Sequence, residues 1–190
     1  LHPELNYVLL DIGDQHYLLE EELHKGALER FNVQAVGKSD KVYKGSDLEG
    51  VMLQHPFYNK QVPVIMGEHV TTETGTGAVH TSPSHGQDDY VVGLKYNLPL
   101  ECPVDGKGVF IETTEHVAGE FIFKANTTII ELLKKKNTLV THTPMTHSYP
   151  HCWRHKTPVI FRATPQWFVS MTQNKLRDTV NAEILNVKWI

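Results

Sequence analysis

Residues 75–90 (GTGAVHTSPSHGQDDY) carry the side chains best suited to chemistry in this chain of 190 residues. They include three glycines, two histidines, two adjacent aspartates and four Ser or Thr hydroxyls, but only a few apolar groups. Glycines let the backbone turn tightly and let a ligand approach its N–H groups. The imidazoles and carboxylates can transfer protons or hold a cation. We therefore interpret this segment as one wall of a polar cleft.

Two elements must position these side chains. The sequence predicts a strand that ends at residues 79–80, followed by a polar loop. Ser84 fits a helix N-cap, and Gln87, three residues later, completes a capping-box pattern. The helix would run through residues 88–94 with both aspartates in its first turn, where the helix dipole favours anions.

Short strand patterns interrupted by glycine and proline surround this segment, together with helical patterns in the second half. Strands are expected at residues 6–12, 15–19 (a hairpin), 34–39, 42–45, 61–66 and 138–143, and helices at 20–31, 127–136 (with Asn126 as N-cap) and within 170–190. The repeated short strands favour a barrel or sandwich over a parallel sheet. Lys134, Lys135 and Lys136 form either an RNA-contact patch or, more simply, a solvated helix end.

The composition predicts one soluble globular domain, with 40% hydrophobic and 21% charged residues. The net charge of −4 argues against a general nucleic-acid-binding module, but it is compatible with a site that holds the end of one RNA strand. No apolar run reaches the length of a membrane span. Two isolated cysteines, Cys102 and Cys152, fit a reducing compartment, so we expect a cytoplasmic protein.

Residues 75–90 resemble the editing insertion of isoleucyl-tRNA synthetases, in which Gly-Thr-Gly-x-Val-His precedes a proline, a glycine and an acidic pair. Residues 148–158 (SYPHCWRHKTP) and 161–168 (FRATPQWF) are similar to the exit of the same insertion, where the chain returns to the catalytic domain. The motifs stand in the right order and about the right distance apart. The resemblance spans nearly the whole chain and is closest to bacterial-type enzymes.

This resemblance implies an α+β, mainly β fold. It would be a closed or partly open β-barrel of the valyl-, isoleucyl- and leucyl-tRNA synthetase editing-domain type, with flanking helices. Residues 1–158 would form the editing domain, and residues 159–190 would return towards the class I catalytic domain.

The implied function is hydrolysis of valine from mischarged tRNA(Ile), within an enzyme that attaches isoleucine to tRNA(Ile) using ATP. A second site is needed because one missing methylene gives only about 1–3 kcal/mol of discrimination, a magnitude established on this class of enzyme. The implied partners are the valine-bearing 3′ end of tRNA(Ile) and the remaining synthetase domains, with no membrane. The editing domain itself would use no cofactor, since ATP and Mg²⁺ belong to the catalytic domain.

Two residues carry the implied reaction. In the family the second acid of the motif holds the α-ammonium of the amino acid, and Asp89 is the matching residue. An ionised carboxylate suits that task through a charge-assisted hydrogen bond. His80 matches a residue that shapes the pocket against isoleucine, with general-base chemistry the less favoured role.

Further residues are assigned to substrate binding. Gly75, Thr76 and Gly77 would turn backbone N–H and C=O groups towards the terminal adenosine, with Val79 beside them. Tyr149 would close one wall of the pocket or, equally, pack in the core.

A zinc site is the less favoured interpretation of the remaining histidines and cysteines. Cys152 and His155 have half-site spacing, but a tetrahedral site needs four ligands and Cys102 stands near no second ligand. We therefore expect no metal and interpret most of the twelve histidines, His55 included, as surface residues.

One departure from the family pattern bears on activity. A threonine-rich strand followed by Pro-Trp-Thr and an Asn precedes the family segment that matches residues 5–12, and this chain starts beyond it. One alternative is therefore a truncated, non-catalytic module that binds the tRNA 3′ end. Another is the editing domain of a valyl- or leucyl-tRNA synthetase, because these insertions share the general pattern. A metal-dependent hydrolase is a distant third.

Overall fold

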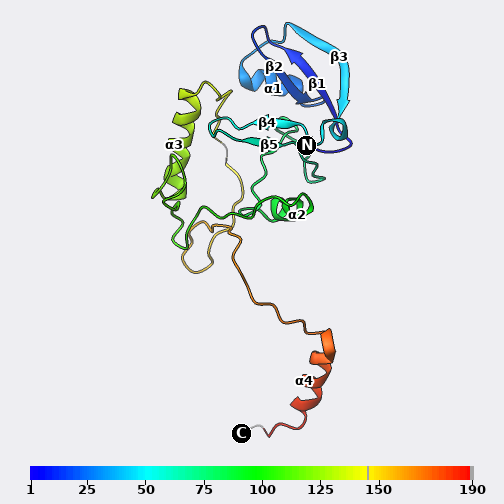
Figure 1. Ribbon diagram of the computed structural model, residues 1–190, viewed down its shortest axis with the longest axis vertical. Coiled ribbons are helices and arrows are strands. Elements are labelled where there is room, and N and C mark those ends of the chain that lie inside the picture. The colour runs from blue at the N-terminus through cyan, green and yellow to red at the C-terminus, as the bar shows by residue number, and fades with distance from the viewer. Residues whose placement is uncertain (145, 189–190) are drawn as a thin grey trace.

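The computed structural model describes residues 1–144 and 146–188 as a mixed α and β protein (Figure 1). Its elements are β1 (Asn6–Asp11), β2 (His16–Glu20), α1 (His24–Phe31), β3 (Gly37–Lys44), the 3-10 helix η1 (Gly45–Leu48), β4 (Met52–Gln54), β5 (Gln61–Pro63), α2 (Gln87–Lys95), α3 (Ile122–Lys135), the 3-10 helix η2 (Gln173–Lys175) and α4 (Leu176–Ile184). The helices contain more residues than the strands, so the expected predominance of strand is not seen in these residues. No helix among them is long and apolar enough to cross a membrane.

The strands form two antiparallel sheets, one of order β2-β1-β3 and one made of β4 and β5. The first contains the hairpin expected at residues 6–19, and β3 joins the two strand segments expected between residues 34 and 45. Within the described residues the two sheets do not close into a barrel.

The central strand β1 sends its side chains to two different surroundings, because successive residues of a strand point to opposite faces. On one face Val8 and Leu10 pack in an apolar cluster with Ala27 of α1. On the other face lies Tyr7, which is fully buried and pairs in register with Glu20. The second face is the one that receives the site segment.

Helix α1 begins at His24, four residues later than the expected helix over 20–31. Glu20 ends strand β2 instead of opening the helix. Its buried carboxylate accepts the N–H groups of Glu22 at 2.8 Å and Leu23 at 2.9 Å. The acid therefore holds the turn between strand and helix.

Helix α3 begins earlier than expected, at Ile122, with Phe121 as its N-cap. Phe121 pairs with Val109 in an isolated bridge, and the Ile122 N–H donates to the Gly108 carbonyl at 3.0 Å. These contacts start the helix upstream, so Asn126 lies inside it and is not the N-cap.

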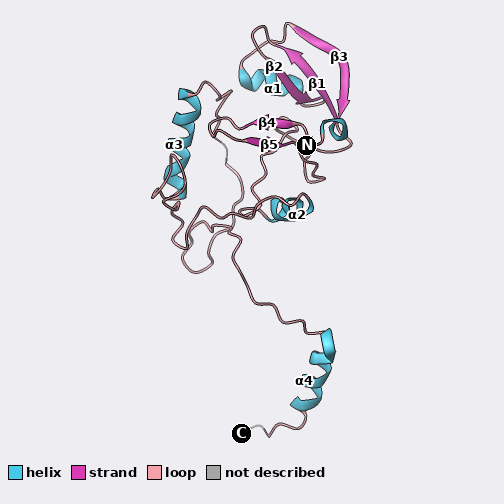
Figure 2. Cartoon of the chain, viewed as in Figure 1, coloured by secondary structure: helices cyan, strands magenta, loops and turns pink. Residues whose placement is uncertain are grey.

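Two segments that we expected to be strands are loops (Figure 2): residues 138–143 and the strand predicted to end at residues 79–80. Both runs contain strand-forming residues but have no partner strand within the described chain, and a strand needs one to bond its backbone groups.

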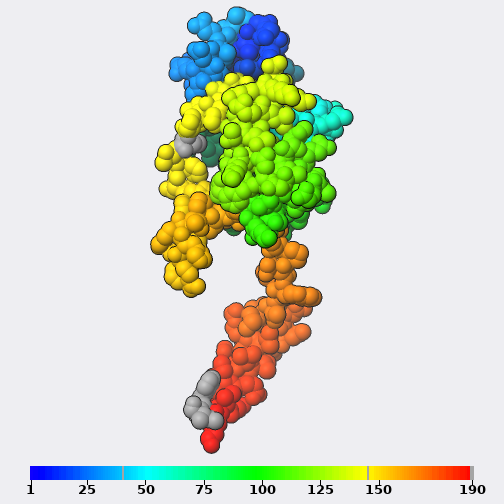
Figure 3. Space-filling view, turned by 90° about the vertical axis from the view of Figure 1, so that its left-hand side faces the viewer, coloured from blue at the N-terminus to red at the C-terminus, as the bar shows by residue number. Residues whose placement is uncertain are grey.

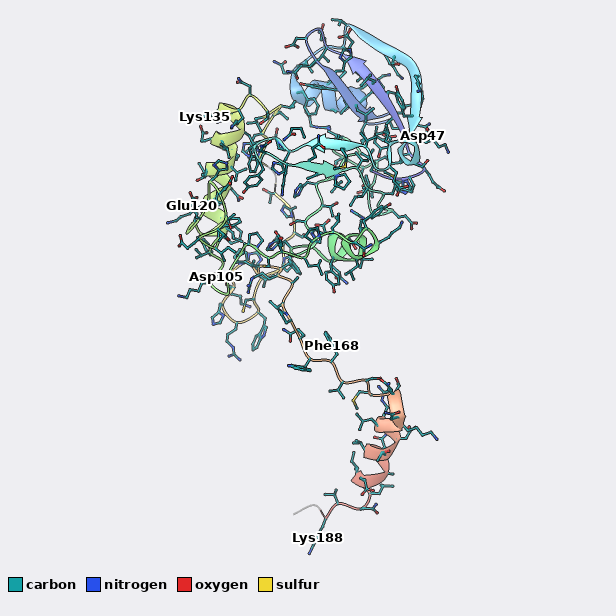
Figure 4. All side chains as sticks on the ribbon, in the orientation of Figure 1. Asp47, Asp105, Glu120, Lys135, Phe168 and Lys188 are labelled. Carbon is teal, nitrogen blue, oxygen red and sulfur yellow. The ribbon has the colours of Figure 1, made fainter. Side chains whose placement is uncertain are left out.

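The C-terminal segment stands away from the rest of the chain (Figure 3). Residues 164–170 have no regular structure and lead to α4. Trp167 and Phe168 are 100% and 89% exposed, and Phe168 is labelled on this extended stretch in Figure 4. The helix expected within residues 170–190 is present as α4, while residues 189 and 190 lie outside the described part of the chain.

Candidate functional site

The glycine motif lies in a loop that is bound to the first sheet and α1 through three successive carbonyls. We call residues 75–78 the glycine loop. Gly75 and Gly77 have φ angles of 91° and 76°, in the left-handed region that favours glycine. The three contacts are from Arg30 Nη2 to the Gly75 carbonyl, from the Glu20 N–H to the Thr76 carbonyl at 3.0 Å, and from the Tyr7 hydroxyl to the Gly77 carbonyl at 2.7 Å.

This arrangement decides which backbone groups a ligand can reach. In a trans peptide the C=O and the following N–H point to opposite sides. The N–H of Thr76 therefore points away from the Arg30 guanidinium and the N–H of Gly77 away from the β2 backbone, and neither donates to a protein acceptor in the described residues. Each of the carbonyls of Gly75, Thr76 and Gly77 accepts one hydrogen bond from the protein, and the expectation that they face an adenosine stays a prediction. The same expectation for the N–H groups also stays a prediction.

Gly77 is required by close packing as well as by its φ angle. It is buried, and a Cβ at this position would overlap the Cβ of Glu20 and lie 3.3 Å from a ring carbon of Tyr7. The loop can approach the sheet this closely because residue 77 has no side chain.

Val79 and His80 follow the glycine loop and are exposed. Burial lowers the pKa of His55, with smaller contributions from the charges of Lys60 and His80. His55 is partly buried, which corrects its assignment to the surface. Its Nδ1 accepts the backbone N–H of Tyr58 at 3.1 Å, a role that requires an unprotonated nitrogen.

An aromatic cluster surrounds His55 at the tip of the β4–β5 hairpin. Phe57 meets the His55 ring edge-on with centroids 4.5 Å apart, and Tyr58 stacks on His116 at 5.8 Å. Sequence reasoning missed this cluster because His116 comes from a distant segment. The aromatic run at 55–58 was its one local signal.

Asp89 lies in the first turn of α2, as expected, but the helix is capped differently. Gly86 occupies the N-cap, and Ser84 is buried at 4% exposure, with no hydrogen-bond partner for its Oγ among residues 1–144 and 146–188. A Cβ on Gly86 would lie 2.5 Å from the Asp89 Oδ2, so the carboxylate folds back over the helix start. Asp88, its neighbour, is exposed.

Tyr149 belongs to a separate small hairpin of residues 149–159. Its hydroxyl donates to the Val159 carbonyl at 2.9 Å. In the described residues no hydrogen bond joins it to the glycine loop or Asp89, so its place in a pocket wall stays a prediction. In the same hairpin the Cys152 Sγ lies 3.3 Å from the His155 Nδ1. Within the described chain no third candidate ligand joins this pair.

Comparison with known proteins gives two findings. Residues 19–139 match the family model described as "Leucyl-tRNA synthetase, editing domain". Over all 190 residues the chain is 61% identical to an isoleucine–tRNA ligase of Ruthia magnifica subsp. Calyptogena magnifica and 57% identical to one of Vesicomyosocius okutanii subsp. Calyptogena okutanii. Over 192 aligned residues it is 52% identical to one of Alkalilimnicola ehrlichii. The chain spans about 20% of the length of each of these relatives.

Proposed function

This chain belongs to the leucyl-tRNA synthetase editing-domain family, and on that basis we propose that it hydrolyses the ester between a wrong amino acid and its tRNA. Its similarity to isoleucine–tRNA ligases over all 190 residues supports valine on tRNA(Ile) as the substrate. The surrounding enzyme would attach isoleucine to tRNA(Ile) with ATP in another domain.

The observation that carries the proposal is that residues 75–90 hold two kinds of group suited to binding a substrate. The glycine loop carries two amide groups that donate to no acceptor within the described residues, and α2, which begins nine residues further on, carries a half-buried acid, Asp89. In the proposed reaction Asp89 holds the α-ammonium of valine, and His80 limits the space for a larger side chain. Water attacks the ester carbonyl, the bond to the ribose oxygen breaks, and valine and uncharged tRNA leave.

The test is a deacylation assay with Val-tRNA(Ile). It should be run on this chain and on the Ruthia magnifica ligase with the chain replacing its matching residues, so that the chain is also assayed within a full-length ligase. We expect hydrolysis by the replaced enzyme. Binding without hydrolysis in both proteins would favour a non-catalytic tRNA-end module. Parallel assays with mischarged tRNA(Val) and tRNA(Leu) test the assignment to the other two synthetases.

The proposal extends to the architecture and location of the protein. We place the two sheets in a closed or partly open barrel completed by a further strand, since β2 and β3 are both edge strands of the first sheet. Residues 1–158 would be the editing domain, and residues 159–190 would lead to the catalytic domain. The site of action would be the cytoplasm, where tRNA is charged.

A further inference from the structure

Tyr7 joins the first sheet to the glycine loop. It is fully buried, and its ring lies between two close glycines: added Cβ atoms at Gly45 and Gly77 would stand 3.1 and 3.3 Å from its ring carbons. Its hydroxyl accepts the His2 N–H at 3.0 Å and donates to the Gly77 carbonyl at 2.7 Å. Burial raises the pKa of Tyr7 above its usual value, so the hydroxyl keeps the proton that it donates.

Arg30 holds the other end of the same loop. It lies in the last turn of α1, and its Nη2 donates to the Gly75 carbonyl. A charged donor makes a stronger hydrogen bond than a neutral one. Arg30 is exposed, so this contact can be removed without opening the core.

Between these two anchors, the Glu20 N–H binds the Thr76 carbonyl. Arg30 thus fixes the orientation of the 75–76 peptide plane from α1, and Glu20 fixes that of the 76–77 plane from β2. Those planes carry the N–H groups of Thr76 and Gly77, each of which points away from the donor that holds its plane.

We propose that Tyr7 and Arg30 are positioning residues of the editing site: they hold the glycine loop so that the Thr76 and Gly77 amides face the substrate. The inference rests on the proposed function for its effect on hydrolysis, but the anchoring itself does not. Neither residue touches the reacting ester. Each acts through a carbonyl of the loop.

The first test is amide hydrogen exchange of the 190-residue chain. The Glu20 amide reports on loop docking because its acceptor is the Thr76 carbonyl. Tyr7→Phe and Arg30→Gln should each speed its exchange about tenfold, as expected for loss of one hydrogen bond. Amides between β1 and β2 should not change. Tyr17→Phe and Lys25→Gln are matched controls, one removing a hydroxyl from β2 and the other a charge from α1.

The second test is the split between KM and kcat in the Val-tRNA(Ile) assay. Both variants should raise KM about tenfold with little change in kcat, because the loop amides contact bound and reacting substrate alike. The Kd of an amide-linked valyl-adenosine should rise by the same factor. Neither control should alter either value.

The outcomes separate the two proposals. Unchanged Glu20 exchange in both variants would overturn the anchoring, and faster exchange with unchanged KM and Kd would overturn the positioning role. If the unsubstituted protein hydrolyses nothing, the proposed function fails. Exchange and the analogue Kd then still decide this inference. If Tyr7→Phe does not fold, Arg30→Gln alone decides it.

Discussion

The two motifs that resemble the synthetase insertion, residues 75–90 and 148–168, are held in opposite ways. The first depends on distant parts of the chain: its glycine loop is bound by residues of β1, β2 and α1, and its Ser84 is buried. The second bonds largely to itself, as in the contact between Tyr149 and Val159. Its aromatic residues are exposed, with Trp153 at 76% and Trp167 at 100%.

The difference shows that the two motifs have different structural requirements. Residues 75–90 are fixed by contacts inside this chain, so their conformation can be tested on the chain alone. Residues 148–168 expose large apolar side chains, which proteins usually cover with another surface. The two motifs meet where the Ala163 N–H donates to the Ser84 carbonyl at 2.8 Å.

The largest expected effect tests whether the first motif does the chemistry. Asp89→Ala should lower kcat/KM for Val-tRNA(Ile) roughly 100-fold, the upper range for loss of one charge-assisted hydrogen bond. Asp88→Ala is the matched control, because its exposed carboxylate shares the same helix turn. Equal hydrolysis by the two variants would remove Asp89 from the site.

The next effect measures how tightly the first motif is held. Gly77→Ala should reduce the free energy of unfolding by about 2–4 kcal/mol, through left-handed strain and overlap with Glu20. Gly75→Ala has similar strain but nothing within 4 Å of its added Cβ, so it should cost about 1–2 kcal/mol. Denaturant titration compares them. Equal losses would contradict the close packing at residue 77.

His80→Ala tests selectivity within the same motif. If His80 limits the pocket, its removal should speed hydrolysis of correctly charged Ile-tRNA(Ile) about tenfold, the scale of one methylene. The measurement is deacylation of Ile-tRNA(Ile) beside Val-tRNA(Ile). Continued full protection of the isoleucyl ester would reject this role.

The titration of His55, whose pKa the charge of His80 helps to lower, should make the stability of the chain depend on pH. Burial, with the charges of Lys60 and His80, lowers the pKa of His55, so the unfolded chain takes up a proton first as pH falls. Its stabilising contribution is complete above about pH 6.5 and is lost as pH falls below that value. Between pH 7.5 and 5.5 the thermal midpoint of His55→Gln should fall less than that of the unsubstituted chain. The midpoint of the exposed control His16→Gln should fall as much as that of the unsubstituted chain. An identical decline in both variants would contradict the assignment.

The smallest effect belongs to the second motif. Trp167→Ser and Phe168→Ser remove side chains that are 100% and 89% exposed. Each should change the free energy of unfolding of this chain by less than about 0.5 kcal/mol. A loss above 1 kcal/mol in a denaturant titration would show that these residues are packed and would erase the contrast between the motifs.

Local patterns in the sequence predicted the elements that local interactions decide. The strand patterns at residues 6–12 and 15–19 predicted the β1–β2 hairpin, and the capping-box pattern predicted a helix where α2 lies. The N-cap was wrong because Ser84 and Gly86 are both acceptable caps locally, and Ser84 is buried in the fold, with its carbonyl bound to a residue 79 positions later.

In the candidate site, too, local features could be predicted from the sequence and long-range contacts could not. Gly75, Gly77 and Asp89 could be selected from residue type and family resemblance. The roles of Tyr7, Arg30 and Glu20 could not, because each reaches the glycine loop across 45 to 70 residues of chain. A tyrosine in a strand pattern predicts only a place in a sheet.

The contact between Tyr7 and Gly77 also has a consequence for the order of folding. The three strands that surround Tyr7 end at Lys44, so this sheet can form from the first quarter of the chain. The loop arrives 70 residues after Tyr7, and its closure entropy is recovered only on a surface that already exists. We therefore expect the sheet to form first during synthesis and the glycine loop to dock on it late.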